Sequence, residues 1–317
     1  MKKILIYGLG QVFNTYKIIF ENEIALGAKI VGYSDKMIKK VQPFFGPDEI
    51  SNLVIDEVVV TCNSYEEIRE ELVAKQVTCN IVHYWKYLHD NWNIDLRAVK
   101  FLDKTFIDDL IMCRKILGRA PKNFVEIGAN FAQDAVLVKK VFGIRDEDIY
   151  VFEPHPDIMD VIKKKYNFNF FQNAVSCFNG EANFHMCKID KLVNNGMSSL
   201  KDSSRYNEDY KTVKVNAVTM EEMINRKEVI EAIDLVKIDV EGNTYEVLKG
   251  FGDKIRKVKI IQCEGDYFPL WEGEVLFGDI FTFLWEEGFR MVNFHITDDK
   301  RETDSLWVNN DILNNCE

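Results

Sequence analysis

Four acidic side chains lie inside or directly after short apolar runs of the sequence. Glu126 is flanked by Phe-Val and Ile, Glu153 follows Ile-Tyr-Val-Phe, Asp239 follows Leu-Val-Lys-Ile, and Glu264 follows Lys-Ile-Ile-Gln-Cys. Apolar runs of this length are typical of buried strands, and the carboxyl ends of parallel strands meet at one edge of a sheet. Carboxylates gathered there can accept hydrogen bonds from ribose, hold a metal ion or take a proton.

The segment 123–139 predicts how a ligand is held at that edge. A strand leads into a turn of small or turn-tolerant residues and then into an amphipathic helix. Such a turn lets the backbone approach a nucleotide-like ligand, and an acid about twenty residues later is placed to bind ribose hydroxyls. We therefore expect the turn and two acids to bind the cofactor: Glu126, Gly128, Ala129, Asn130 and Glu153. The alternative is an ordinary strand–helix unit of a parallel sheet.

These residues favour a cationic nucleoside over a dinucleotide. A dinucleotide loop carries Gly-x-Gly-x-x-Gly, which the turn lacks, and the carboxylate of Glu126 would repel a pyrophosphate. S-adenosylmethionine instead offers an amino group, a sulfonium and a ribose. The loop after the third strand of a doubly wound sheet lies beside the adenine, so Asn173 and Ala174 are further cofactor-binding candidates. A plain turn is the alternative there.

Residues 233–242 carry a second concentration of charge. Lys237, Asp239 and Glu241 alternate along an apolar strand, so their side chains share one face if the strand continues. Charges on a buried strand are costly unless they are paired or functional. Asp239 is the first candidate for a general base or metal ligand, with Glu264 as a second carboxylate that could share Mg²⁺ with it.

Other roles for these charges stay open. Lys237 is a catalytic candidate beside Asp239, and a purely structural Lys237–Asp239 pair is the alternative. Three histidines are other candidate bases: His155, His185 and His295.

Composition sets wide bounds on the class of protein. The chain has 317 residues, a hydrophobic fraction of 47% and a formal net charge of -11. The length suits two ordinary domains, and the negative charge argues against nucleic acid as a partner. No apolar run reaches about 20 residues, so no membrane insertion is expected. The seven cysteines are scattered without Cys-x-x-Cys, which favours reduced thiols and a cytoplasmic protein.

The pattern of residues 1–95 predicts a separate Rossmann-like domain. Short apolar runs alternate with helical patterns, as in a parallel sheet. Gly8 and Gly10 supply two of the three small residues of a dinucleotide loop, but Phe13 stands at the third position. Asp35 stands where a ribose-binding acid would stand. We expect a packing or partner module, with nucleotide or nucleotide-sugar binding as the alternative.

Two further segments complete the chain. Residues 96–121 predict a helical connector, with a helix over 105–117 and Thr105 as its candidate N-cap. Residues 122–317 predict the second α/β domain, which ends in two strands that could pair antiparallel. A polar loop over 194–200 is expected to shape a substrate cleft.

The second domain resembles the FkbM family of S-adenosylmethionine-dependent methyltransferases. Five segments carry the resemblance, in the family's order and spacing: Phe124–Asn130, Val151–Pro154, Asn173–Ser176, Met197–Leu200 and Leu235–Gly242. The resemblance implies a class I methyltransferase fold. It also implies cofactor contacts at Glu126, Gly128 and Asn130, a ribose contact at Glu153, and a place for Asp239 in the reacting site.

One departure from the family pattern changes the contacts expected at the methionine part of the cofactor. Phe131 and Asp134 replace a small residue and a Ser or Thr in the first turn of the helix. Asp134 therefore joins the cofactor-binding candidates.

The sequence thus predicts two doubly wound Rossmann-like α/β domains, the second with a class I methyltransferase fold. By resemblance, the reaction is O-methylation of a hydroxyl on a sugar, glycan or related small molecule, in surface polysaccharide or secondary-metabolite biosynthesis. The implied cofactor is S-adenosylmethionine, with Mg²⁺ as a candidate, and the acceptor is a small molecule or glycan. Two functions stay open beside it: a nucleotide-sugar oxidoreductase that uses the N-terminal Gly-rich turn, and a non-catalytic partner module. The sequence does not indicate an oligomeric state.

Overall fold

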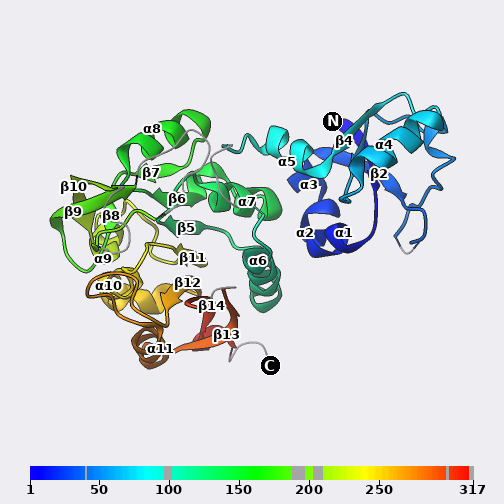
Figure 1. Cartoon of the computed structure of the whole chain (residues 1–317). Coiled ribbons are helices and arrows are strands. Elements are labelled where there is room, and N and C mark those ends of the chain that lie inside the picture. Colours follow the sequence, from blue (N-terminus) through cyan, green and yellow to red (C-terminus); the bar gives the residue numbers. More distant parts are fainter. Residues whose placement is uncertain (40, 96–101, 188–196, 203–209, 298–299, 314–317) are drawn as a thin grey trace. The chain divides into compact units, whose positions relative to one another are not determined.

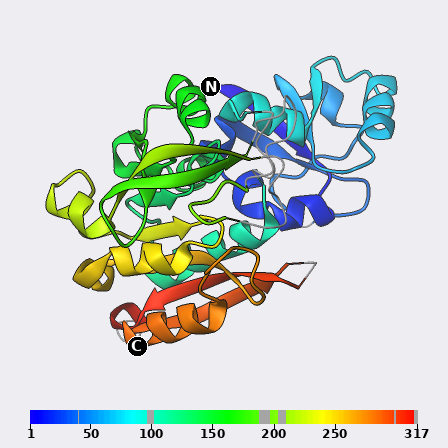
Figure 2. The same cartoon turned by 60° about the vertical axis from the view of Figure 1, so that its left-hand side comes forward.

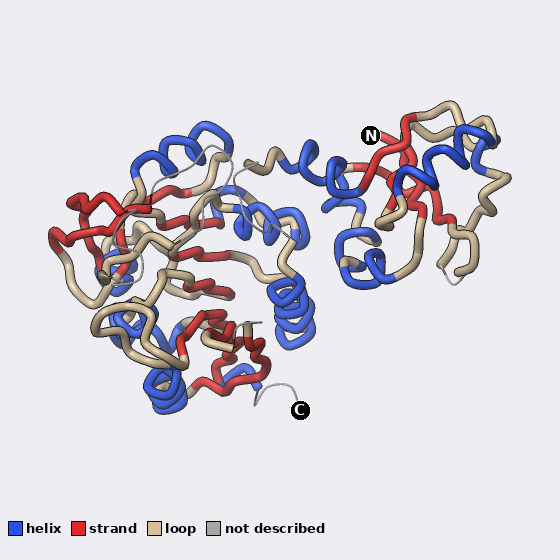
Figure 3. The backbone as a smooth tube through the Cα atoms, viewed as in Figure 1, coloured by secondary structure: helices blue, strands red, loops and turns tan. Residues whose placement is uncertain are grey.

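The computed structural model describes residues 1–39, 41–95, 102–187, 197–202, 210–297 and 300–313 (Figures 1 and 3). The chain divides into two compact units. The first comprises Met1–Ile94 with Lys140–Gly143, and the second comprises Asp95–Lys139 with Ile144–Glu317. Over the described ranges, none of the helices has the length and apolar character needed to cross a membrane.

The first unit is built on four parallel strands, β1 Lys2–Tyr7, β2 Ala28–Ser34, β3 Glu57–Val60 and β4 Asn80–His83, in the order β2-β1-β3-β4. Its helices are α1 Gln11–Thr15, α2 Lys17–Phe20, α3 Glu23–Leu26, α4 Tyr65–Ala74 and α5 Tyr84–Trp92. Leu5, Val58 and Val60 are fully buried and pack with Leu72 of α4. Their burial explains why these short apolar runs form parallel strands.

The turn after β1 lies against the acid that could have bound a ribose. The N–H of Leu9 donates to Asp35 Oδ2 at 2.7 Å. The other oxygen, Oδ1, accepts from the N–H groups of Met37 and Ile38 at 2.8 and 3.0 Å. Phe13 is buried where a small residue would let helix and strand pack closely. The buried Phe13, which stands at the third position of a dinucleotide loop, favours a packing role for this turn over nucleotide binding.

The second unit is built on seven strands: β5 Phe124–Ile127, β6 Ile149–Phe152, β7 Asn169–Phe171, β11 Leu235–Ile238, β12 Ile260–Asp266, β13 Phe289–Ile296 and β14 Glu302–Asn309. Their order is β13-β14-β12-β11-β5-β6-β7. The five strands from β12 to β7 are parallel, and β14 and β13 add an antiparallel pair at one edge. The strand order reverses between β5 and β11, and open α/β sheets bind ligands at such a point.

The helices of this unit are α6 Lys104–Leu117, α7 Gln133–Phe142, α8 Pro156–Lys165, α9 Met220–Asn225, α10 Thr244–Gly250, α11 Phe277–Glu286 and α12 Asn310–Leu313. Figure 1 shows α6 and α7 on one side of the sheet and α10 and α11 on the other. The predicted α/β class with doubly wound parallel sheets is confirmed.

The two faces of the seven-stranded sheet differ because side chains alternate along each strand. On one face Val125 and Val236 are fully buried and belong to an apolar core with residues of α9, α10 and α11. The other face has Glu126, Lys237 and Gln262 at paired positions of β5, β11 and β12. This row of polar side chains lies on the side of α6 and α7.

A second, small sheet follows β7. It consists of β8 Ala174–Val175, β9 Gly180–Cys187 and β10 Tyr210–Val218 in the order β8-β10-β9. Figure 2 shows β9 and β10 side by side as a long antiparallel pair. Of the polar loop expected over 194–200, residues 194–196 lie outside the described ranges. Ser199 bridges to His185 of β9.

Two local predictions need correction. The N-cap of α6 is Asp103 and not Thr105, because the Asp103 carboxylate accepts from the N–H of Thr105 at 2.8 Å. Strand β12 continues through Asp266, so Glu264 lies inside the strand and not at its end. Pairing with β14 extends the strand, since Glu264 and Asp266 pair with Asp304 and Glu302.

Candidate active site

A cavity of about 270 Å³ lies at the carboxyl edge of the seven-stranded sheet. Its wall includes the turns after β5, β6 and β11, side chains of β12 and β14, and the starts of α6 and α7. Most of the predicted site residues line it: Glu126, Gly128, Ala129, Asn130, Asp134, Glu153, Asn173, Ala174, Lys237 and Asp239. Glu264 does not line the cavity. The structure thus brings together residues that lie more than one hundred positions apart in the sequence.

The turn after β5 is packed tightly against the end of β11. The N–H of Asp239 donates to the carbonyl of Ile127 at 2.9 Å. A Cβ atom on Gly128 would lie 1.7 Å from the carbonyl oxygen of Asp239, and Gly128 has φ +84. Only glycine fits there, because a side chain would overlap the backbone in a left-handed conformation. Gly128 thereby lets β5 and β11 approach at the point where the strand order reverses.

The carboxylate of Glu153 is buried after β6 and held by the backbone. Its Oε2 accepts from the N–H of Asn130 at 2.7 Å, and its Oε1 accepts from the N–H of His155 at 2.7 Å. Burial raises the pKa of Glu153 to about 7, although these two hydrogen bonds act to lower it. Each carboxylate oxygen has two lone pairs, so each can accept one further hydrogen bond. The carboxylate is therefore fixed in place and still able to bind a diol.

The loop after β7 forms the wall on the far side of Glu153. Ala174 is buried, and Asn173 is half-buried and donates weakly to the carbonyl of Asn216 at 3.4 Å. Pro154 and Ile158 line the same region of the cavity. Small and apolar groups with one amide make a surface on which a flat heteroaromatic ring could lie.

A buried ammonium joins two acids beneath the β5 turn. Lys237 Nζ lies 3.0 Å from Asp134 Oδ2 and 2.6 Å from Asp239 Oδ2. It also lies 5.7 Å from the centroid of the Phe106 ring of α6. Burial acts to lower the pKa of Lys237, but Asp239, Asp134 and Glu126 outweigh burial and hold the pKa well above its usual value. The structural pair of Lys237 with Asp239 is therefore present, and Asp134 extends it.

Glu126 lies on the same polar row, with its carboxylate turned toward α7. Its Oε2 accepts from the N–H of Ala135 at 3.2 Å. Burial, followed by the neighbouring Asp134, raises the pKa of Glu126 well above its usual value. Burial likewise raises the pKa of Asp134, even though Lys237 acts to lower it. Three acids, Glu126, Asp134 and Asp239, thus surround the one ammonium of Lys237, so the site favours an additional positive group.

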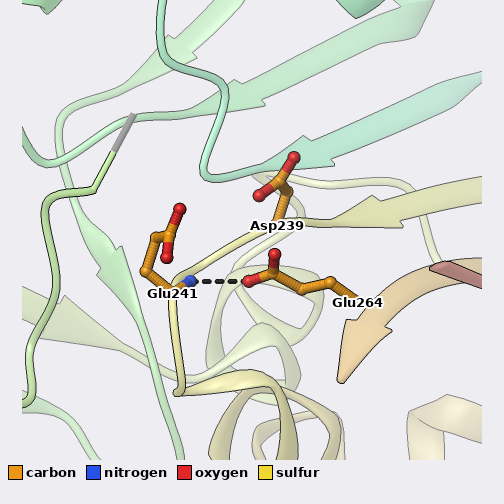
Figure 4. A group of neighbouring side chains, drawn as sticks. All are labelled: Asp239, Glu241 and Glu264. Carbon is orange, nitrogen blue, oxygen red and sulfur yellow. Dashed lines mark hydrogen bonds between the residues drawn. The ribbon is translucent and has the colours of Figure 1, made fainter. Parts of the chain in front are cut away.

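Beside the cavity, Asp239, Glu241 and Glu264 form an acidic cluster in which one oxygen from each lies within 4.8 Å of the others (Figure 4). Glu264 Oε1 accepts from the N–H groups of Val240 and Glu241 at 3.1 and 2.7 Å. Burial raises the pKa of Glu241 and of Glu264 well above the usual value, and Asp239 adds to both shifts. Carboxylates crowded in this way can hold a divalent cation.

The alternation expected over residues 237–241 ends early. Strand β11 stops at Ile238, and Glu241 has φ 51, so its side chain leaves the line of the strand. The hydroxyl of Ser199 donates to the carbonyl of Glu241 at 2.6 Å. The turn, and not a continued strand, brings Glu241 beside Asp239.

The sequence motifs did not indicate several polar residues of the wall, among them Asp103, Gln262 and Asp304. Gln262 Nε2 donates to Asp304 Oδ1 at 3.1 Å. Burial raises the pKa of Asp304 to about 6, even though Lys237 acts to lower it. A polar side chain inside the apolar run of β12 was the available sequence signal for Gln262.

The three candidate histidines lie elsewhere. His155 is buried with Nε2 3.3 Å from the carbonyl of Cys187, and His185 Nδ1 lies 3.1 Å from the hydroxyl of Thr212. His295 Nε2 lies 3.4 Å from Asp109 Oδ1. None of the three is among the described residues that line the cavity.

The model of the methyltransferase FkbM domain matches residues 126–291, and a model named C2185-like, N-terminal, matches residues 1–82. No curated protein matches the chain.

Solved structures with some similarity include three methyltransferases. The FkbM methyltransferase from Methylobacillus flagellatus KT has 10% identity and a TM-score of 0.39, over 97% of this chain and 90% of that one. TrmK from M. capricolum with S-adenosyl-homocysteine has 10% identity and a TM-score of 0.36, over 63% and 68%. Magnesium protoporphyrin IX methyltransferase from Synechocystis PCC 6803 with bound SAM has 10% identity and a TM-score of 0.36, over 71% and 93%.

The FkbM domain model spans more than half of the chain, from within β5 to within β13. Within that span lie the Gly128 turn, the buried acid after β6 and the charged end of β11. The chain therefore belongs to the FkbM methyltransferase family and is an S-adenosylmethionine-dependent methyltransferase.

Proposed function

We propose that the protein transfers a methyl group from S-adenosylmethionine to a hydroxyl of a sugar, glycan or related small molecule. We further propose a role in surface polysaccharide or secondary-metabolite biosynthesis. One observation carries the reaction: a single cavity contains the buried acid Glu153 on one side of Gly128 and Asp239 on the other. The first suits a nucleoside, and the second suits a hydroxyl that must lose its proton.

The residues present fit the cofactor. Glu153 keeps free acceptor capacity for two ribose hydroxyls, and Gly128 leaves the backbone bare beside the carbonyl of Asp239. Glu126 and Asp134 offer negative charge to an amino group. Asn173 and Ala174 would border the adenine, and Ala129 and Asn130 would border the ribose. When bound, the cofactor supplies an electrophilic methyl group on a sulfonium.

Asp239 is proposed to act on the acceptor hydroxyl. In the transfer the acceptor oxygen bonds to the methyl carbon, the sulfur–carbon bond breaks with its electron pair left on sulfur, and the hydroxyl proton goes to Asp239. Lys237 holds the Asp239 carboxylate at 2.6 Å, which supports a positioning role for the ammonium. Positioning of the hydroxyl at the methyl can account for much of the rate.

A divalent cation such as Mg²⁺ is a further part of the proposal. Asp239 and Glu264, joined by Glu241, would supply its ligands, and the crowding of these three acids supports this (Figure 4). Hard cations prefer such oxygen ligands. Loss of activity in EDTA and recovery with Mg²⁺ or Mn²⁺ is the expected result, whereas unchanged activity would assign Asp239 as a simple base.

The test of the function is transfer of label from methyl-labelled S-adenosylmethionine. Candidate acceptors are methyl glycosides, oligosaccharides and nucleotide sugars, and heat-denatured protein is the inactive control. The proposal expects acid-stable label on an oxygen of the acceptor. Label on nitrogen or carbon, or a protein that does not bind S-adenosylmethionine, would contradict it.

The cellular location is also a proposal. We propose that the protein acts in the cytoplasm. The cysteines of the described residues are free thiols, which supports a reducing compartment.

A further inference from the structure

The cavity has two halves, on opposite sides of the point between β5 and β11 where the strand order reverses. Glu153 and Asn173 follow β6 and β7 on one side, whereas Gln262 and Asp304 lie on β12 and β14 on the other. Five strand spacings of about 4.8 Å separate β7 from β14, or roughly 24 Å. The acidic half is defined by Asp103, Lys237, Asp239, Glu241, Gln262 and Asp304.

The charged side chains that line this cavity are almost all acidic. Among its described lining residues, seven carry carboxyl groups, and Lys237 alone carries a cationic side chain. That ammonium already lies within ion-pair distance of Asp134 and Asp239. In the protein without a bound divalent cation, a phosphate or carboxylate on a ligand would add a like charge to a partly buried site, where charges repel more strongly than in water.

Gln262 adds an independent observation that points to a ligand. The residue is 2% exposed, its Nε2 donates to Asp304 Oδ1, and its Oε1 has no hydrogen-bond partner. Turning the amide over would place Oε1 against the carboxylate of Asp304, so the orientation is fixed. A buried acceptor without a partner costs free energy, which a ligand that donates a hydrogen bond would recover.

We infer that the acceptor is a neutral or amine-bearing polyol without phosphate or carboxylate near its reacting hydroxyl, and that Gln262 and Asp304 accept hydrogen bonds from its hydroxyl or ammonium groups. This inference rests on the proposed methyl transfer. Hydroxyl and ammonium groups are the donors that an acceptor-rich wall can satisfy.

The test compares three acceptors that share one sugar ring and differ in charge: methyl glucoside, methyl glucosaminide and methyl glucuronide. They are neutral, cationic and anionic, and each is assayed with labelled S-adenosylmethionine and the full-length protein. The inference expects turnover of the neutral and cationic members and a loss of about tenfold or more in kcat/KM for the anionic one. Preferred turnover of the glucuronide, or of a nucleotide sugar, would overturn it.

The variant Asp304→Asn tests whether the acidic half of the cavity causes the preference for neutral and cationic acceptors. The change keeps a hydrogen-bond acceptor for Gln262 and removes one charge. The acceptor KM for the cationic member should rise severalfold and its advantage over the anionic member should shrink, while the affinity for S-adenosylmethionine stays within about twofold. Asp253→Asn removes the same charge from an exposed position outside the cavity and should change neither. A rise in the Kd of S-adenosylmethionine alone would place the cofactor in this half and overturn the assignment.

A second measurement decides the matter if none of the three glycosides is methylated. Cationic, neutral and anionic nitroxides are added to the protein saturated with S-adenosylhomocysteine, and paramagnetic relaxation is measured at the amides of Asp103, Glu241 and Asp304 in the acidic half. Stronger relaxation by the cationic than by the anionic nitroxide supports the inference, and the reverse order overturns it. Failure of S-adenosylhomocysteine to bind would instead contradict the proposed function.

Discussion

At the end of β6, the carboxylate of Glu153 is held by two backbone N–H groups and faces the cavity with acceptor capacity to spare. If it binds the ribose, Glu153→Ala should weaken binding of S-adenosylmethionine by about 1–3 kcal/mol, the cost of losing charge-assisted hydrogen bonds. Isothermal calorimetry measures this directly. Unchanged affinity in a folded variant would remove Glu153 from the ribose site.

The same residue predicts a pH dependence of cofactor binding. The pKa of Glu153 is raised to about 7 from an ordinary value of 4.5, so below pH 7 the free protein carries a proton there. Ribose hydroxyls that donate to the carboxylate favour its ionised form, and binding must then release that proton. The affinity should rise from pH 5.5 to pH 7 and level off above it. Glu153→Gln should flatten this profile, and an unaltered profile in that variant would assign the dependence to another group.

The raised pKa of Glu153 also predicts how the stability of the folded protein changes with pH. A carboxyl whose folded pKa exceeds its unfolded pKa contributes stability that is fully present below pH 4.5 and is lost as pH rises through 7. The cofactor-free protein should therefore gain from Glu153→Gln at pH 8 relative to pH 5. Melting curves at the two pH values provide the comparison.

Asp239 can be either a reacting group or the structural partner of Lys237. Asp239→Asn keeps the size of the side chain and removes its charge. A reacting role predicts a loss of about 10²-fold or more in turnover with little change in cofactor affinity. A structural role predicts a lower melting temperature and nearly intact turnover per folded molecule. Both quantities measured on one purified variant separate the two roles.

At the scale of elements, the site depends on how closely β5 approaches β11. Gly128→Ala places a methyl group 1.7 Å from the carbonyl oxygen of Asp239, so the strand ends must separate. The variant should lose at least about 2 kcal/mol of stability, together with cofactor binding. Gly118→Ala is the matched control: Gly118 also has a left-handed φ, of +64, but nothing lies within 4 Å of its Cβ position. Equal melting temperatures for the two variants would show that the close approach carries no cost.

Sequence patterns predicted the strands of this edge well because buried parallel strands are short apolar runs closed by turn residues. Glu126, Glu153 and Asp239 were found because each interrupts or ends such a run. Gln262 and Asp304 were not, because a polar residue on β12 and an acid on β14 meet only after the sheet pairs. The Asp103 cap and the length of β12 also depend on tertiary contacts, which local patterns do not contain.

The same limit applies to the acidic cluster. Asp239 and Glu264 were expected to meet, since both follow neighbouring apolar runs. Glu241 joins them through a left-handed backbone turn that Ser199 holds, although Ser199 lies 42 positions away in the sequence. Alternation along a continued strand predicted that Glu241 lies on the same side as Asp239. Glu241 does lie beside Asp239, but the turn after β11 brings it there.

At the scale of the whole molecule, the cavity belongs to the second unit. All of its described lining residues fall between Asp103 and Asp304, and none falls in 1–94 or 140–143. In the first unit, buried Phe13 stands at the third position of a dinucleotide loop, where a small residue is required. These observations support a division of function in which the second unit performs the chemistry and the first unit performs none of it.

This division predicts the behaviour of a shortened protein. Residues 100–317, produced without the first unit, should bind S-adenosylmethionine with an affinity within about threefold of the full chain, because every proposed cofactor contact is retained. Circular dichroism and a cooperative melting transition must first establish that the shortened protein is folded. Calorimetry with S-adenosylmethionine then gives the affinity, and Glu153→Ala in the shortened protein gives the matched loss. A folded protein of residues 100–317 that cannot bind the cofactor would mean that the first unit completes the site. If the shortened protein binds the cofactor but no longer transfers the methyl group, the first unit contributes only to binding of the acceptor.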